Sequence, residues 1–476
     1  MRIFLILVLL QVGYSHSIAQ KVVCNCRANL DTLIASAELN YAGYPAKVNA
    51  HSSKDYHRMA ERIRRMASGL DDPKKCYYLL ADYVRFFRDK HFIVSYLPEQ
   101  DEDSLVVPVN EAGLKKYFSA PNRLALEGIW MSADSSVKVA IRLVQDGLYQ
   151  GIRLASKSDQ FPVGFVYFTI RRQGEKLYVK AYDRFMSTEV PVKQYGNLLQ
   201  FWNESMFGKI YPSSTNAREQ EELARWRTTK GLYYAEPAPD VAYLKIPSFG
   251  NNEQEIAALV QANDSAIRSR PYLVLDLRGN SGGSAGWVSL LPYMMTNAIE
   301  QPLSYLRVSP NNVKLKLGDL EPFVTAPIPD EYQKYFPPAM LAKYKKAYEE
   351  LPSTRDDFYP IPGVHFPLEE NLKYPRKVAL IVDDRCGSST EYFFYLTRQS
   401  AKTIRYGCNT LGMMDYEGMS IPLKMPFNRF IITVPSVKSG WTDSAPIDQT
   451  GFQPDVVLKE PYEEWLPVII KDLKRR

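Results

Sequence analysis

The sequence predicts an α/β protein with a helical N-terminal segment, a β-rich middle block and a C-terminal core in which strands and helices alternate. Three patterns predict this. Apolar residues recur at helical spacing over 55–67 and 73–89. Short alternating runs fill 120–215, and strand–helix alternation begins near 225. We expect a leader at 1–19 and domains at 20–118, 119–220 and 221–476, the last with a lid insertion at 305–372.

The leader has the pattern of a secretory signal. Arg2 supplies the charged start, residues 3–10 the apolar stretch, and Ser17-Ile18-Ala19 the small-residue cleavage site. The apolar stretch is too short to span a membrane, and no later run is long enough. The sequence therefore predicts an exported, periplasmic or extracellular protein cleaved near Ala19.

Composition excludes some function classes. The chain has 476 residues, is 45% hydrophobic and 24% charged, and carries 59 Lys and Arg against 53 Asp and Glu, with both signs interspersed. Such a mixture does not indicate nucleic-acid binding, and we read the basic tail Lys471–Arg476 as solvated. Cysteine and histidine spacing gives no zinc signature, so we expect no metal site. We also expect no cofactor. The oligomeric state stays open.

The five cysteines leave at least one thiol unpaired within the chain. Cys76 is a candidate partner for either Cys24 or Cys26. Cys386 and Cys408 both lie near the ends of predicted strands, so these two are candidate neighbours. The sequence does not decide between these pairings.

The helical segment gives way to a strand after Asp89-Lys90-His91. The β-rich block is an antiparallel sheet, sandwich or small barrel, because turn signals such as Asp146-Gly147 separate its runs.

The core contains near-continuous apolar runs, which are typical of strands covered on both faces. We expect core strands at 241–246, 272–277, 378–382 and 404–406, and helices at 252–268 and 287–295. The Pro-rich, charged lid includes helical sequence over 331–350.

Ser388 is the most informative residue, because it lies between the apolar run 378–382 and the helical stretch 392–396. A hydroxyl there is close to free N–H groups at a helix N-terminus, where an oxyanion is stabilised. Ser388-x-x-Glu391 is also a capping box. By the frequency of such caps alone, the cap is the more common explanation.

A glycine-rich loop, residues 278–286, follows the predicted strand 272–277. It lacks the Gly-Lys-Ser/Thr ending of a phosphate loop, which leaves an oxyanion-donor loop or a plain tight turn. The segment 279–283 also matches Gly-x-Ser-x-Gly, the nucleophile elbow of α/β-hydrolases. That match would make Ser281 a nucleophile with His365 as the available base.

Five motifs occur in order, and together they resemble the tail-specific (C-terminal-processing) serine peptidase family. That family includes the tricorn protease core and the interphotoreceptor retinoid-binding protein. The motifs are 241–246, Asp276-Leu277-Arg278-Gly279-Asn280-Ser281-Gly282-Gly283, Ser388-Ser389-Thr390-Glu391, Gly407-Cys408-Asn409-Thr410-Leu411-Gly412 and Gly451-Phe452-Gln453-Pro454-Asp455. The resemblance implies a crotonase-like (ClpP/crotonase) α/β core, with Ser388 as nucleophile and N–H groups of Gly282 or Gly283 and of Ser389 as oxyanion donors.

The resemblance also implies a choice of general base. Bacterial tail-specific members use a lysine 25 residues after the serine, and this position holds Met413, whose thioether cannot take a proton. The tricorn-like branch uses a histidine in a motif similar to Asp89-Lys90-His91-Phe92, so His91 becomes the candidate base. For His91 the alternative is a helix C-cap. That branch has a glutamate where this chain has Asp448, which becomes the candidate orienting or polarising residue.

These observations support three hypotheses. The first is an exported serine endopeptidase that cleaves peptides or unfolded proteins through an acyl-enzyme. The second is a catalytically inactive peptide- or ligand-binding protein on the same scaffold, suggested by Met413 and Asp448. The third is an esterase that uses Ser281 and His365. No segment fits the PDZ domain of tail-specific members, so specificity for a free carboxyl terminus is not carried over.

Overall fold

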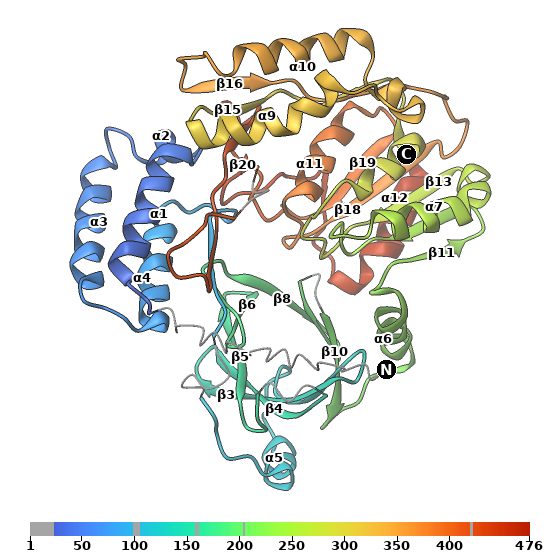
Figure 1. Ribbon diagram of the computed structural model, residues 1–476. Helices are drawn as coiled ribbons and strands as arrows, with labels where there is room; N and C mark the ends of the chain where they lie inside the picture. Colours follow the sequence, from blue (N-terminus) through green and yellow to red (C-terminus); the bar gives the residue numbers. More distant parts are fainter. Residues whose placement is uncertain (1–22, 99–104, 158–160, 203–204, 419–421) are drawn as a thin grey trace, which may run out of the picture.

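The computed structural model describes residues 23–98, 105–157, 161–202, 205–418 and 422–476. Its elements form a helical unit, a β-barrel, an α/β core and a helical arm (Figure 1). The predicted leader at 1–19 lies outside the described residues. No helix in the described ranges has the length and apolar character needed to cross a membrane.

The helical unit consists of α1 (Cys26–Asn40), α2 (Tyr44–Lys47), α3 (Ser53–Ala67) and α4 (Pro73–Arg85), followed by strand β1 (Ile93–Tyr96). The Asp72 side chain caps α4 by accepting from the Lys75 amide, and Pro73 occupies the first turn, where a missing N–H costs nothing. Helix α4 ends four residues before the Asp89 at which the periodicity predicted its end. A disulfide joins Cys26 to Cys76, whereas Cys24 is free.

The core of the helical unit contains residues from the other end of the chain. Strand β1 pairs antiparallel with β21 (Phe430–Thr433), with Val94 opposite Ile432. Aromatic side chains of the helices pack with Tyr416, Phe427 and Phe430 in one buried cluster. The N-terminal helices are therefore anchored to the C-terminal part of the core.

The β-rich block is a closed eight-stranded antiparallel barrel, one of the alternatives that the sequence left open. Apolar side chains of its strands pack together in one cluster inside the barrel, among them Trp130, Phe168 and Phe201. The strands are β2 (Gly128–Ser132), β3 (Val137–Gln145), β4 (Leu148–Ser156), β5 (Val166–Gln173), β6 (Lys176–Ala181), β8 (Val190–Tyr195), β9 (Leu198–Phe201) and β10 (Ser205–Tyr211). Helix α5 (Glu111–Phe118) precedes the barrel, β7 (Phe185–Met186) pairs with β1, and α6 (Ala217–Thr229) follows the barrel.

The core is a six-stranded, mostly parallel sheet in the order β11-β12-β13-β18-β19-β23. Its central strands are buried on both faces, as their apolar runs predict. Helices α7 and α11 cover one face and α12 the other. The elements are β11 (Tyr233–Ala238), β12 (Val241–Lys245), α7 (Glu253–Arg268), β13 (Tyr272–Asp276), β18 (Lys377–Val382), α11 (Ser389–Leu396), β19 (Thr403–Gly407), β23 (Val456–Val457) and α12 (Trp465–Arg475).

The predicted helix 287–295 is not continuous. A 3₁₀ turn (Gly286–Leu290) leads into the short α8 (Leu291–Met294). Pro292 has no N–H to donate, so it is tolerated only in the first turn of a new helix. The predicted helical sequence over 331–350 is divided in the same way, into a 3₁₀ turn (Asp330–Tyr335) and α10 (Pro338–Glu350).

Within the segment 305–372, which the sequence predicts to be a lid insertion, two helices form an arm above the core (Figure 1). Helices α9 (Pro310–Thr325) and α10 pack through an apolar cluster that includes Leu320, Met340 and Tyr344. A four-stranded sheet, β16-β15-β22-β20, ties the arm to the core. The remaining strands are β14 (Ile299–Glu300), β15 (Ser304–Arg307), β16 (Phe358–Ile361), β17 (His365–Phe366), β20 (Tyr416–Glu417) and β22 (Val437–Ser439).

The disulfide predicts a clear stability effect. Replacing Cys26 and Cys76 by alanine opens a cross-link between positions 50 residues apart and should destabilise the helical unit by about 2–4 kcal/mol. Thermal unfolding followed by circular dichroism measures this as an earlier first transition. Cys408→Ala, which removes a free thiol, is the control. Equal melting temperatures of the double variant and the control would contradict the prediction.

Candidate active site

Ser388 occupies the turn between β18 and α11 in a strained backbone conformation. Its φ is +52° and its ψ −125°, a region that residues other than glycine rarely adopt. Its side chain makes no capping hydrogen bond to α11. Glu391 does not close back on Ser388 either, because its carboxylate accepts from Thr410, Gly412 and Met413. The capping-box interpretation of these residues is therefore wrong, and the hydroxyl is directed elsewhere.

The Ser388 hydroxyl meets the ring of His91. The distance from His91 Nε2 to Ser388 Oγ is 3.0 Å, although 297 positions separate the two residues. His91 Nδ1 lies 2.6 Å from the backbone carbonyl of Tyr416. A carbonyl only accepts, so Nδ1 carries the proton in the neutral ring and Nε2 is the acceptor. Ser388 Oγ–H therefore donates to His91 Nε2.

Three further contacts fix the position of His91. Its backbone N–H donates to the Asp89 carboxylate at 2.8 Å, and Asp89 also accepts from the Tyr41 hydroxyl at 2.8 Å. The His91 carbonyl accepts from Thr433 in strand β21. These bonds place the ring after the end of α4, so His91 is not the C-cap of that helix.

Electrostatics keep the His91 ring neutral near pH 7. The residue is 2% exposed, and burial lowers the pKa of His91 below its usual 6.5. The Tyr416 carbonyl and the charge of Asp448 act in the opposite direction. Burial also raises the pKa of Asp89 to about 6. A neutral imidazole hydrogen-bonded to a hydroxyl can accept its proton.

Asp448 lies near this pair without contacting it within the described residues. Its Oδ2 accepts from the Lys47 ammonium at 2.6 Å, and its backbone N–H donates to Asp415. Burial raises the pKa of Asp448, with the charge of Asp89 acting in the same direction. Asp448 thus faces α2 rather than the ring, and only its charge acts on His91.

The glycine loop, residues 279–283, lies against the Ser388 turn. A Cβ added at Gly282 would come within 2.7 Å of Ser388 Cβ and 2.8 Å of Ser389 N, so only glycine allows this approach. Gly282 N–H donates to the Asn280 side chain at 2.9 Å, which corrects its expected role as a free oxyanion donor. Within the described ranges, the N–H groups of Gly283 and Ser389 have no acceptor.

Sequence patterns assigned Glu391 only a capping role and Asp383 none, yet both are buried carboxylates that fix loops near Ser388. Glu391 holds the loop 410–413 by the three bonds given above, with Met413 N–H donating at 3.0 Å. Asp383 accepts from the Gly279 amide and from the guanidinium of Arg385. Both are acidic residues within five positions of Ser388, but the sequence alone does not show which loops they bind.

The other sequence candidates do not converge. His365 lies on β17, where its ring contacts Glu300, and no contact in the described part of the chain joins it to Ser281. Cys386 and Cys408 are not bonded to each other, and the Cys386 thiol donates to the Leu277 carbonyl. The described residues contain no group of three His, Cys, Asp or Glu that could hold a metal ion.

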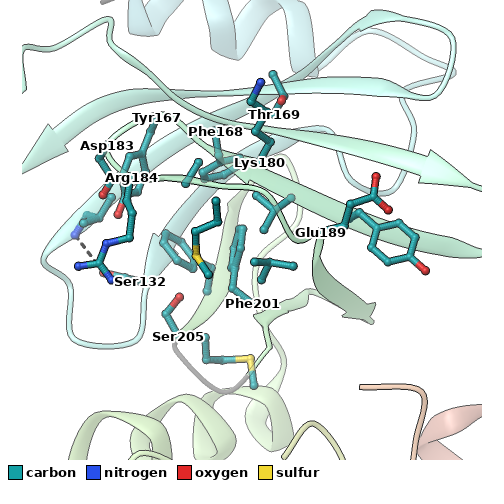
Figure 2. A pocket seen from close by; sticks show the side chains of 18 of the residues that line it. Ser132, Tyr167, Phe168, Thr169, Lys180, Asp183, Arg184, Glu189, Phe201 and Ser205 are labelled. Atoms are coloured by element: carbon teal, nitrogen blue, oxygen red, sulfur yellow. Dashed lines mark hydrogen bonds between the residues drawn. The ribbon is translucent and has the colours of Figure 1, made fainter. Parts of the chain in front are cut away.

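A separate cavity of about 960 Å³ opens at the barrel (Figure 2). Phe168, Phe201 and Phe207 contribute apolar surface, whereas Lys180, Asp183 and Arg184 contribute charge. Neither Ser388 nor His91 is among the described residues that line it.

Comparison with known proteins identifies the class to which this fold and site belong. Residues 240–458 match the family model of peptidase family S41. This match supports a tail-specific, S41-type peptidase of the serine class. A comparison with curated protein sequences returned no match.

Solved structures with a TM-score above 0.5 share the fold. The crystal structure of mature CPAF has 13% identity and a TM-score of 0.54, over 94% of this chain and 97% of that chain. Mature CPAF complexed with lactacystin has 13% identity and a TM-score of 0.53 over the same shares. The tricorn protease has 12% identity and a TM-score of 0.39, with 94% of this chain and 37% of that chain covered.

Glu391 should carry a pH-dependent part of the stability. Burial raises the pKa of Glu391 to about 7 from an ordinary 4.5, so the folded state binds this proton more tightly than the unfolded chain. Its stabilising effect is full below pH 4.5 and is lost as the pH rises to about 7. In Glu391→Gln this pH dependence of the stability disappears. The substitution should also cost about 1–3 kcal/mol of stability, because an amide NH₂ then faces a backbone N–H.

Melting temperatures at about pH 5 and about pH 8 test this expectation. The difference between the two should be smaller in Glu391→Gln than in the parent. Glu255→Gln, on the exposed side of α7, is the control. An unchanged difference in Glu391→Gln would count against the assignment.

Proposed function

We propose that this chain is an exported serine endopeptidase that hydrolyses peptide bonds through an acyl-enzyme, with Ser388 as nucleophile and His91 as general base. The hydrogen bond of 3.0 Å between Ser388 Oγ and His91 Nε2 carries the proposal. Serine is a weak nucleophile without such a partner. The proposal includes a crotonase-like arrangement of the core sheet, with both loops at the carboxyl ends of β13 and β18.

In the first half-reaction Ser388 Oγ attacks the peptide carbonyl carbon, and its proton moves to His91 Nε2. The oxyanion is held by the N–H groups of Gly283 and Ser389, which have no acceptor in the described chain. His91 then gives the proton to the leaving amine as the C–N bond breaks. The negative charge of Asp448 favours the protonated ring in between, because it raises the pKa of His91.

In the second half-reaction water attacks the ester carbon of the acyl-enzyme. His91 accepts a proton from the water and returns it to Ser388 Oγ as the ester bond breaks. The Tyr416 carbonyl keeps the ring oriented throughout, because it binds the Nδ1 proton. Met413 takes no part in proton transfer, so a serine–lysine pair is replaced by a serine–histidine pair.

Export is supported by the disulfide between Cys26 and Cys76, since disulfides persist mainly in oxidising compartments. Export also agrees with the signal-like segment 1–19. We propose a peptide or unfolded protein as substrate. The barrel stands where tail-specific members have a PDZ domain, so we propose no requirement for a free carboxyl terminus.

Removing the nucleophile or the base should abolish turnover. Ser388→Ala and His91→Ala are each expected to lower kcat/KM on an unstructured peptide by at least about 10³-fold, because neither half of the pair functions alone. A fluorophosphonate probe should label Ser388 in the parent and not in either variant. His365→Ala, in which the changed ring contacts Glu300, should keep parental activity.

The outcomes separate the three hypotheses. Labelling that maps to Ser281 and is lost in His365→Ala would support the esterase. Peptide binding without labelling or cleavage would support the inactive binding protein. Either result would overturn the peptidase proposal.

The pH profile should report the lowered pKa of His91. Only the neutral ring accepts the serine proton, so kcat/KM should be constant at higher pH and fall as the pH drops through the pKa of His91. Burial places that midpoint below 6.5. Steady-state kinetics on a neutral peptide measure it, with His365→Ala as control. A midpoint at or above 6.5 would contradict the burial argument.

A further inference from the structure

Strand β9 of the barrel lies against the Ser388 loop, residues 383–388. Arg385 Nη1 donates to Gln200 Oε1 at 2.8 Å, and the Trp202 indole N–H donates to the Arg385 backbone carbonyl at 2.7 Å. Gln200 Nε2 donates in turn to the Trp202 carbonyl at 2.8 Å. The first two bonds join the barrel to a backbone segment that ends at the reactive hydroxyl, and the third holds Gln200 and Trp202 together.

The bond between Arg385 and Gln200 is buried and the two bonds of Trp202 are partly buried, so water cannot freely replace these contacts. Gln200 is 3% exposed and Arg385 1% exposed. The Arg385 guanidinium also binds Asp383, which accepts from the Gly279 amide, and it donates to the Tyr462 hydroxyl at 2.6 Å. One side chain thus links β9, the glycine loop and the Ser388 loop.

Trp202 is held in an unfavourable backbone conformation. Its φ is +45°, a region that costs energy for a bulky residue unless its surroundings fix it. The indole bond to Arg385 is such a fixing contact. Phe201, the last residue of β9, faces the barrel lumen. Gln200 before it and Trp202 in the turn after it both bind Arg385 of the core.

We propose that Gln200 and Trp202 are positioning residues that hold the Ser388 loop, through Arg385, in the geometry needed for attack. The inference rests on the proposed peptidase function and extends it. The barrel then contributes to catalysis although it supplies no group that touches the substrate. The proposed effect of these two residues on the rate is geometric, because small displacements of reacting groups reduce rates strongly.

Trp202→Phe and Gln200→Met test the proposal, because each keeps most of the side-chain volume and removes one hydrogen-bonding group. We expect kcat to fall at least about 10-fold with KM within about twofold of the parent. Gln200→Glu keeps an acceptor for Arg385 but loses the donor to the Trp202 carbonyl, so its kcat should lie between those of the parent and of Gln200→Met. The pH midpoint should not move, because His91 and its neighbours are unchanged.

Trp226→Phe is the matched control. Trp226 is buried beside the barrel on α6, and its indole N–H has no partner among the described residues. The same exchange there removes ring volume without removing a hydrogen bond. Melting temperatures of all variants show whether a loss of kcat follows from unfolding. A fall in kcat of equal size in Trp226→Phe and Trp202→Phe would overturn the proposal.

Hydrogen–deuterium exchange separates failure of this proposal from failure of the proposed function. In Trp202→Phe and Gln200→Met, amides of 385–389 should exchange at least about tenfold faster, with the β18 strand unchanged. If the parent neither labels nor cleaves, the peptidase proposal fails, and exchange still decides whether β9 holds the loop. Unchanged exchange in both variants would overturn the inference whatever the activity.

Discussion

Antiparallel hydrogen bonding between β1 and β21 is the interaction on which the site depends. It places His91, just before β1, beside loops of the C-terminal core, with Ile93 opposite Thr433. Burial in the shared aromatic cluster supports the pairing, because Tyr41 contacts both Phe92 and Tyr416. A slip of one residue would turn every β1 side chain to the opposite face. The distance between ring and hydroxyl thus follows from a strand register.

The Ser388 turn is the second constraint, and its surroundings compensate for its strain. Gly282 allows close approach from one side, and Asn280 accepts from both Gly282 N–H and the Thr390 hydroxyl. Glu391 fixes the neighbouring loop. Buried ion pairs such as Asp383 with Arg385 need not increase stability, because desolvation opposes their attraction. Here they determine which loops lie together at the ends of adjacent strands.

Much of the architecture was predictable because it follows local periodicity. Apolar runs on both faces indicated the core strands, and alternating runs indicated the β-rich block. Local patterns failed where a single residue or a long-range strand pairing decides the hydrogen bonding. Pro292 interrupts the predicted helix at 287–295, and closure of the barrel depends on the pairing of β10 with β2 and β9, which no single strand encodes.

The sequence by itself determined the chemistry available: a serine between a buried strand and a helix, a glycine loop, and a histidine with a neutral form near pH 7. Family resemblance added which of these residues to consider together. Only the tertiary structure decided their contacts. It placed the Ser388 hydroxyl beside the His91 ring and the Asp448 carboxylate beside Lys47. It also bound the Gly282 N–H to the Asn280 side chain. Residue types and local spacing are properties of short segments, whereas the meeting of groups 297 positions apart depends on packing and strand register between distant segments.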